Sequence, residues 1–67
     1  MIKLEIKELN RRIKALNRAI NINNNYLENA KSQKEIDNFV NKLHILRSKK
    51  EQLEIEKELK ILTIKGN

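Results

Sequence analysis

Five basic side chains recur along one face of the first third of this chain. They follow one another at spacings of four, four, three and four residues and form what we call the basic ridge: Lys3, Lys7, Arg11, Lys14 and Arg18. At 100° per residue these positions share one arc of a helix, and no acidic residue lies in that arc. The row is about 22 Å long at 1.5 Å per residue, which suits the repeated phosphates of a nucleic acid. The spacing therefore predicts binding of RNA or DNA.

A second interpretation is that the basic ridge pairs with an acidic row in the last third of the chain. Glu51, Glu54 and Glu58 share a helix face, and in an antiparallel hairpin they would lie beside the first two lysines of the ridge. The two rows would then pair, within one hairpin or across a dimer. A third interpretation is an ordinary solvated face. No aromatic residue interleaves with the ridge, which argues against single-strand binding by base stacking.

Other chemistry-bearing residues are sparse. His44 is the only histidine, and its neighbours Leu43 and Ile45 indicate the edge of a helix seam. The absence of cysteine excludes disulfides, thiolate zinc sites and cysteine nucleophiles. No metal-ligand spacing and no glycine-rich phosphate loop occurs, so we expect no metal and no cofactor. A non-enzymatic function is therefore favoured.

The elements that must position these residues are two amphipathic helices. The first has isoleucine and leucine at heptad a and d spacing, and the second repeats the 3-4-3 pattern. The predicted seam residues are Ile6, Leu9, Ile13, Leu16 and Ile20 in the first segment and Ile36, Phe39, Leu43 and Leu46 in the second. Polar Asn23 and Lys50 occupy seam positions, where they would help to set register and partner choice.

A turn is needed because the phase of the apolar stripe breaks between Ala30 and Ile36. Ser32 and Glu35 form an S-x-x-E capping box there, and Asp37 would be a favourable charge in the first helical turn. The competing turn is the asparagine run at 23–25. We predict a helix over about 2–29, a turn at about 29–32 and a second helix over about 33–62. The apolar residues after position 53 lie on more than one side, so this segment is either apolar on two sides or frayed.

These elements predict a single all-α domain over residues 1–67, an antiparallel two-helix coiled-coil hairpin. Two helices cannot enclose a core, and a chain of this length buries too little surface alone. Several apolar residues would stay exposed outside the seam: Leu4, Ile22, Ile45, Ile55 and Ile61. We therefore expect a homodimeric four-helix bundle, or a hairpin packed on another protein. In length, hairpin shape and basic first helix the chain resembles the plasmid RNA-binding copy-control family.

One segment resembles a second family. Residues 32–37, Ser-Gln-Lys-Glu-Ile-Asp, are similar to the Ser-Gln-x-Leu-Asp signature of the small sporulation-regulatory aspartyl-phosphate phosphatases of low-GC Gram-positive bacteria. Those proteins are helical hairpins with the signature on the second helix, and the similarity covers about residues 5–46. The resemblance implies a response-regulator phosphatase in which Asp37 matches the signature aspartate, Gln33 supplies the amide and Ile36 takes the leucine place. This chain has one extra residue within the signature.

Composition limits the remaining possibilities. The net charge is +6, and no apolar run is long enough for a membrane span, so we expect no membrane partner. The N-terminal residues lack the apolar region of a signal peptide, which favours the cytoplasm. Abundant lysine, isoleucine and asparagine favour a low-GC bacterium or its phage as the source. The predicted function is a non-enzymatic interaction or regulatory protein with a protein partner; nucleic-acid binding and the phosphatase are the alternatives.

Overall fold

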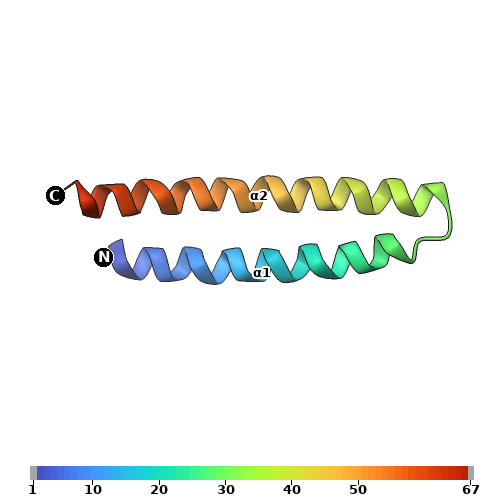
Figure 1. The fold of residues 1–67 in the computed structure, drawn as a ribbon, viewed down its shortest axis with the longest axis horizontal. Helices are drawn as coiled ribbons and strands as arrows, with labels where there is room; N and C mark the ends of the chain where they lie inside the picture. The colour runs from blue at the N-terminus through green and yellow to red at the C-terminus, as the bar shows by residue number, and fades with distance from the viewer. Residues whose placement is uncertain (1, 67) are drawn as a thin grey trace.

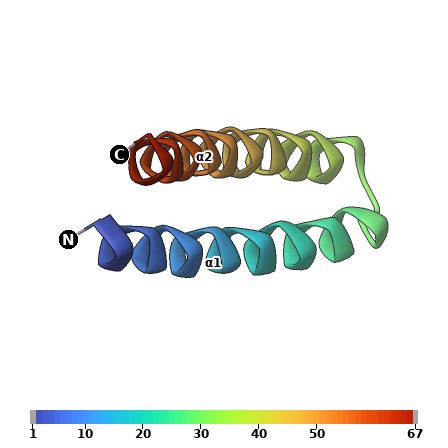
Figure 2. The same ribbon diagram turned by 60° about the vertical axis from the view of Figure 1, so that its left-hand side comes forward.

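Two antiparallel α-helices make up the described chain, residues 2–66 of a computed structural model. α1 spans Ile2–Glu28 and α2 spans Gln33–Lys65, and no strand occurs between residues 2 and 66. Figure 1 shows the helices side by side, with the turn at one end of the rod and both chain ends at the other. Figure 2 shows the same single layer after a rotation of 60°. The predicted all-α hairpin is confirmed. We call the two ends the turn end and the open end.

A side-chain cap starts α2, in which Ser32 and Glu35 each accept from one backbone N–H group. The backbone N–H of Glu35 donates to Ser32 Oγ at 3.2 Å, and Glu35 Oε2 accepts from the backbone N–H of Lys31 at 3.0 Å. Ser32 has extended backbone angles, as an N-cap residue should. The chain therefore turns at the later of the two positions that the sequence offered, and the capping box is what begins the second helix there.

The competing asparagine run lies inside α1. Asn23 is half-buried at its seam position, where its Nδ2 donates to the carbonyl of Ala19 at 2.8 Å. This bond satisfies the amide within its own helix, so the helix continues through three residues of low helix propensity. α1 ends five residues after Asn23, where the N–H groups of Asn29 and Ala30 donate to carbonyls of its last turn.

The seam between the helices carries the buried surface. Leu9, Ile20 and Leu43 are 4%, 9% and 2% exposed, and they are the buried hydrophobic residues of the part of the chain that the structure describes. The other six predicted seam residues are half-buried: Ile6, Ile13, Leu16, Ile36, Phe39 and Leu46. Each helix has one neighbour, so one stripe of each is covered and the remaining faces meet solvent.

Two contacts show the antiparallel register at opposite ends of the rod. At the turn end, the rings of Tyr26 and Phe39 stack with centroids 5.6 Å apart. The Lys42 ammonium lies 5.4 Å from the Phe39 centroid, within cation–π range. At the open end, Lys60 Nζ donates to Glu5 Oε2 at 3.0 Å. The same register thus holds from one end of the hairpin to the other.

Candidate interaction surfaces

The basic ridge follows the outside of α1, and all five of its side chains are exposed. Arg11 makes a long ion pair with Glu8, at 3.7 Å, and both side chains are largely in solvent. An exposed pair of this kind is worth little and opens easily. The ridge therefore presents a continuous line of positive charge along the first two thirds of α1.

The acidic row does not neutralise the ridge within the hairpin. Across residues 2–66, Glu8 pairs with Arg11 and Arg12, and Lys60 pairs with Glu5. Glu54 of the acidic row pairs with Lys50 of its own helix, at 3.7 Å. None of these ion pairs joins the ridge to Glu51, Glu54 or Glu58. Across the part of the chain that the structure describes, the predicted pairing of the two rows within one hairpin is therefore not seen.

A shallow groove runs along one side of the seam. Three open depressions lie in it, of about 210, 390 and 310 Å³ from the open end toward the turn end. Their walls recur every three or four residues, so on each helix they share one face. The α1 wall is Glu5, Glu8, Arg12, Ala15, Ala19 and Asn23. The α2 wall is Lys42, Ile45, Lys49, Gln52, Glu56 and Lys60.

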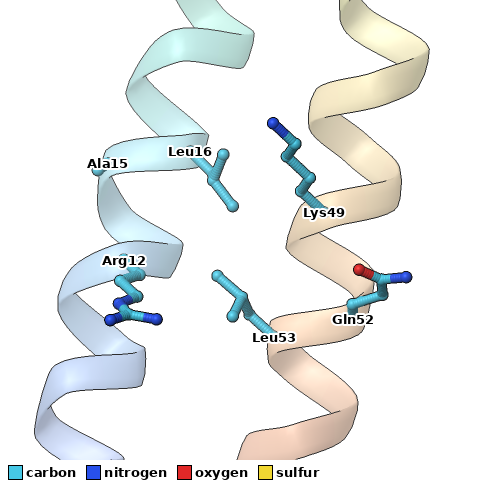
Figure 3. Close-up of a pocket in the computed structure, with 6 residues that line it drawn as sticks. All are labelled: Arg12, Ala15, Leu16, Lys49, Gln52 and Leu53. Atoms are coloured by element: carbon cyan, nitrogen blue, oxygen red, sulfur yellow. The ribbon is translucent and has the colours of Figure 1, made fainter.

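The centre of the groove combines an apolar floor with a charged rim. Figure 3 shows Leu16 and Leu53 projecting from opposite helices into the space between them. Lys49 and Gln52 lie on the α2 side, and Arg12 and Ala15 lie on the α1 side. An apolar floor with a polar rim is the pattern of a protein–protein interface.

α2 is apolar on two opposite sides at the open end. After Leu46 the seam positions continue as Lys50, Leu53, Lys57 and Lys60, all half-buried. The opposite side carries Ile55, Leu59 and Leu62, which are 55%, 59% and 54% exposed. The segment after residue 53 is thus helical to Lys65 rather than frayed. Ile61, expected to be exposed, is half-buried because it lies beside the seam.

The two residues of the phosphatase-like segment touch each other. Gln33 Nε2 donates to Asp37 Oδ1 at 2.9 Å, and both side chains are exposed on the first turns of α2. They are one helical turn apart, which brings the amide and the carboxylate onto one face. Ser32 and Glu35 of the same segment serve the helix cap. Local partners thus exist for four polar residues of the segment: Ser32, Gln33, Glu35 and Asp37.

His44 is exposed on α2, one residue from the buried Leu43. Over residues 2–66 no three His, Cys, Asp or Glu side chains gather as a metal site would require. Neither α1 nor α2, as described, has the length of apolar sequence needed to cross a bilayer.

Sequence reasoning missed the aromatic stack and the groove. The stack joins the only two aromatic residues of the chain, which flank the turn, so their pairing follows once the turn is placed. The groove had one signal, the small residues Ala15 and Ala19 spaced one turn apart beside the seam. Comparisons with family models, with curated proteins and with solved structures find no match to this chain.

Proposed function

We propose that this chain is a non-enzymatic interaction module: a helical hairpin that self-associates, as a dimeric four-helix bundle, and binds a further macromolecule. The proposal rests on one observation: more large apolar residues of the chain are exposed than are buried. Three hydrophobic residues are buried over residues 2–66, whereas nine large ones are 40% exposed or more. They are Leu4, Ile22, Tyr26, Val40, Ile45, Ile55, Leu59, Leu62 and Ile64.

The total surface supports the same proposal. The chain exposes 5553 Å², whereas a compact 8.0 kDa protein exposes about 4,450 Å². The excess of roughly 1,100 Å² is comparable to the ~800 Å² that each partner buries in a standard interface. The radius of gyration, 15.5 Å, likewise exceeds the ~11 Å of a compact chain of this length. Association removes this excess by covering a second face of each helix.

The test is light scattering coupled to size exclusion, at low and at high salt, over a range of concentrations. We expect twice the 8.0 kDa mass of one chain. Leu16→Asp places a charge on the groove floor and should abolish both assembly and helical structure. Asn17→Asp, one residue away, is the matched control and should leave the mass unchanged. A helical monomer at every concentration would overturn the proposal.

The basic ridge supports a second candidate, binding of double-stranded nucleic acid. What favours it is that the ridge has no ion pair with the acidic row across residues 2–66. The two aromatic rings are stacked on each other, so the ridge offers charge to phosphates but no stacking platform to bases. Affinity would then fall steeply with salt concentration, because phosphate contacts release counterions.

Charge reversal separates this candidate from the first. The triple change of Lys7, Arg11 and Lys14 to Glu should abolish binding to duplex RNA and DNA, measured by fluorescence anisotropy at low salt. The control triple changes Lys31, Lys34 and Lys65 to Glu, with the same shift in net charge off the ridge. It should weaken binding only modestly. If both triple variants lose the same affinity for nucleic acid, the ridge contributes only through the net charge of the chain.

A further inference from the structure

We propose that the groove is filled by a second copy of this chain turned end for end, on a twofold axis that passes beside Gln52. This inference rests on the proposed self-association and specifies which face mediates it and in which orientation. In this arrangement each helix lies over its own counterpart, α1 on α1 and α2 on α2, and every neighbouring pair is antiparallel. Such a dimer is closed, since the same patch serves both copies.

The exposed apolar residues of α2 match across this axis. Ile45 and Leu59 lie equally far on either side of Gln52, at heptad spacing, so Leu59 lies where the groove face meets the outer side of α2 that also carries Ile55 and Leu62. Ile45 and Gln52 line the groove. Turning the second copy end for end places its Leu59 opposite Ile45, and its Ile45 opposite Leu59. Side chains that are 53% and 59% exposed in one hairpin thereby cover each other.

The exposed apolar residues of α1 match across the same axis. Leu4 and Ile22 are five helical turns apart, on one face together with the groove residue Ala15. Their midpoint is Ile13, which lies level with Gln52, because Arg12 and Gln52 line the same depression. The axis chosen on α2 therefore also places Leu4 opposite Ile22 of the second copy. The same twofold axis therefore pairs the exposed apolar residues of both helices.

Charges distinguish this orientation from the one with both turns at the same end. With the copies end for end, Lys49 of one copy lies within one residue of the level of Glu56 of the other, because these two are three and four residues from Gln52. The two Arg12 side chains meet beside the axis and form the one like-charge contact near it. With both turns together, α1 of one copy would lie over α2 of the other at the same level. Glu8 would then meet Glu56, because the two already line one depression. Like charges at that separation repel.

The outer side of α2 is the competing contact. It exposes Ile55 and Leu62, but Glu51 and Glu58 flank it. Pairing two such surfaces would bring acidic residues of both copies together. The groove has the better complementarity, and its small residue Ala15 near the axis lets helix axes approach to the ~8–10 Å of packed helices.

Cysteine cross-linking tests the orientation, and the chain has no cysteine of its own. Two single variants, Ile45→Cys and Leu59→Cys, are mixed in equal amounts and oxidised. We expect a mixed disulfide that forms roughly 100-fold faster than in either variant alone, because contact raises the local thiol concentration to the millimolar range. Within each pure variant the two cysteines sit about 21 Å apart along the rod, beyond the reach of a disulfide. Ile55→Cys, mixed with Ile45→Cys, is the control and should stay reduced.

Each other outcome overturns a defined part of the proposed dimer. A dimer by light scattering in which Ile45→Cys links to Ile22→Cys has both turns at the same end, which overturns the orientation. Linking of Ile55→Cys with Leu62→Cys, while the first pair stays reduced, assigns the contact to the outer side of α2. A monomer by light scattering overturns the proposed self-association itself, before any cysteine is introduced.

Discussion

The turn end and the open end of this hairpin use the same heptad positions of α2 for different residues. Toward the turn, the seam positions are Phe39, Leu43 and Leu46, and the Tyr26 ring stacks on Phe39. Toward the open end, three of the seam positions are lysines. Exposed apolar residues lie on the opposite side of the helix: Ile55, Leu59 and Leu62. The turn end is thus built to hold its own two helices together. The open end leaves exposed apolar residues on the side of α2 away from the seam.

Lysine at a seam position does not leave the seam open. Leu9 at the open end is 4% exposed, although Lys60 lines the same depression. The lysine stem can lie along the apolar surface while its ammonium reaches Glu5 in solvent. This arrangement protects the seam, but it contributes less apolar burial than a leucine would. Stability of the isolated hairpin should therefore decrease from the turn toward the open end.

Truncation of Leu43 should have the largest effect, because it is the most buried of the hydrophobic residues that the structure describes. We expect Leu43→Ala to lower the free energy of unfolding by about 3 kcal/mol. Leu62→Ala removes the same atoms from an exposed outer position and should change it by less than ~0.5 kcal/mol. Urea titration followed by circular dichroism measures both. Equal losses would mean that the two ends are equally packed.

Replacement of Lys57 should have the opposite sign. Lys57 is half-buried at a seam position of the open end, so Lys57→Leu extends the apolar seam. We expect the free energy of unfolding to rise by about 1 kcal/mol, part of the value for complete burial of a leucine. Lys34→Leu, on an exposed position of α2, is the control and should change little. A loss of stability in Lys57→Leu would show that the lysine stem already fills its site.

Removal of the helix cap tests the turn end in isolation. Ser32→Ala deletes the oxygen that accepts from the Glu35 N–H and should lower the free energy of unfolding by about 1 kcal/mol. Ser48→Ala lies inside α2 on an exposed position, where alanine is the better helix former, and should be neutral or slightly stabilising. Thermal denaturation of both variants measures the difference. If the two serines behave alike, the turn is held by the aromatic stack rather than by the cap.

The turn end was largely predictable because its signals are local. Heptad spacing indicated the helices, and Ser32 with Glu35 indicated where the second one begins. Each of these signals depends only on a few neighbouring residues, so it can be recognised in the sequence without knowing the tertiary structure. The Tyr26–Phe39 stack was missed because it depends on the register across the turn, which no local pattern carries.

The open end was less predictable for a physical reason. An apolar stripe such as Ile55, Leu59 and Leu62 says that a face must be covered, but not by which surface. The pairing of charged rows also depends on how far flexible side chains reach and on which nearer partners compete. Lys50 lies one helical turn from Glu54 and forms an ion pair with it, so the Glu54 carboxylate has a closer partner than the ridge. The candidate ridge could thus be located from sequence, whereas its freedom from the acidic row could not.

The Glu5–Lys60 contact gives the smallest and the most specific test of the open end. The hydrogen bond from Lys60, and then its charge, hold the pKa of Glu5 below its usual value of 4.5. Because the folded-state pKa is the lower one, the contact stabilises the hairpin fully above pH 4.5 and is lost as the pH falls through the folded pKa. The melting temperature of the parent chain should exceed that of Glu5→Gln at pH 7, and the gap should close in acid.

A double-mutant cycle with Lys60→Met isolates the pair from other changes in charge. The coupling should be present at pH 7 and low salt, and it should weaken in 1 M salt, because the contact is exposed and screening reaches it. If the coupling is lost in acid but not in 1 M salt, the hydrogen bond contributes more to the coupling free energy than the charge interaction does. A coupling that survives acid would mean that the carboxylate contributes nothing as an ion, and the open end would then be held by apolar and stem contacts alone.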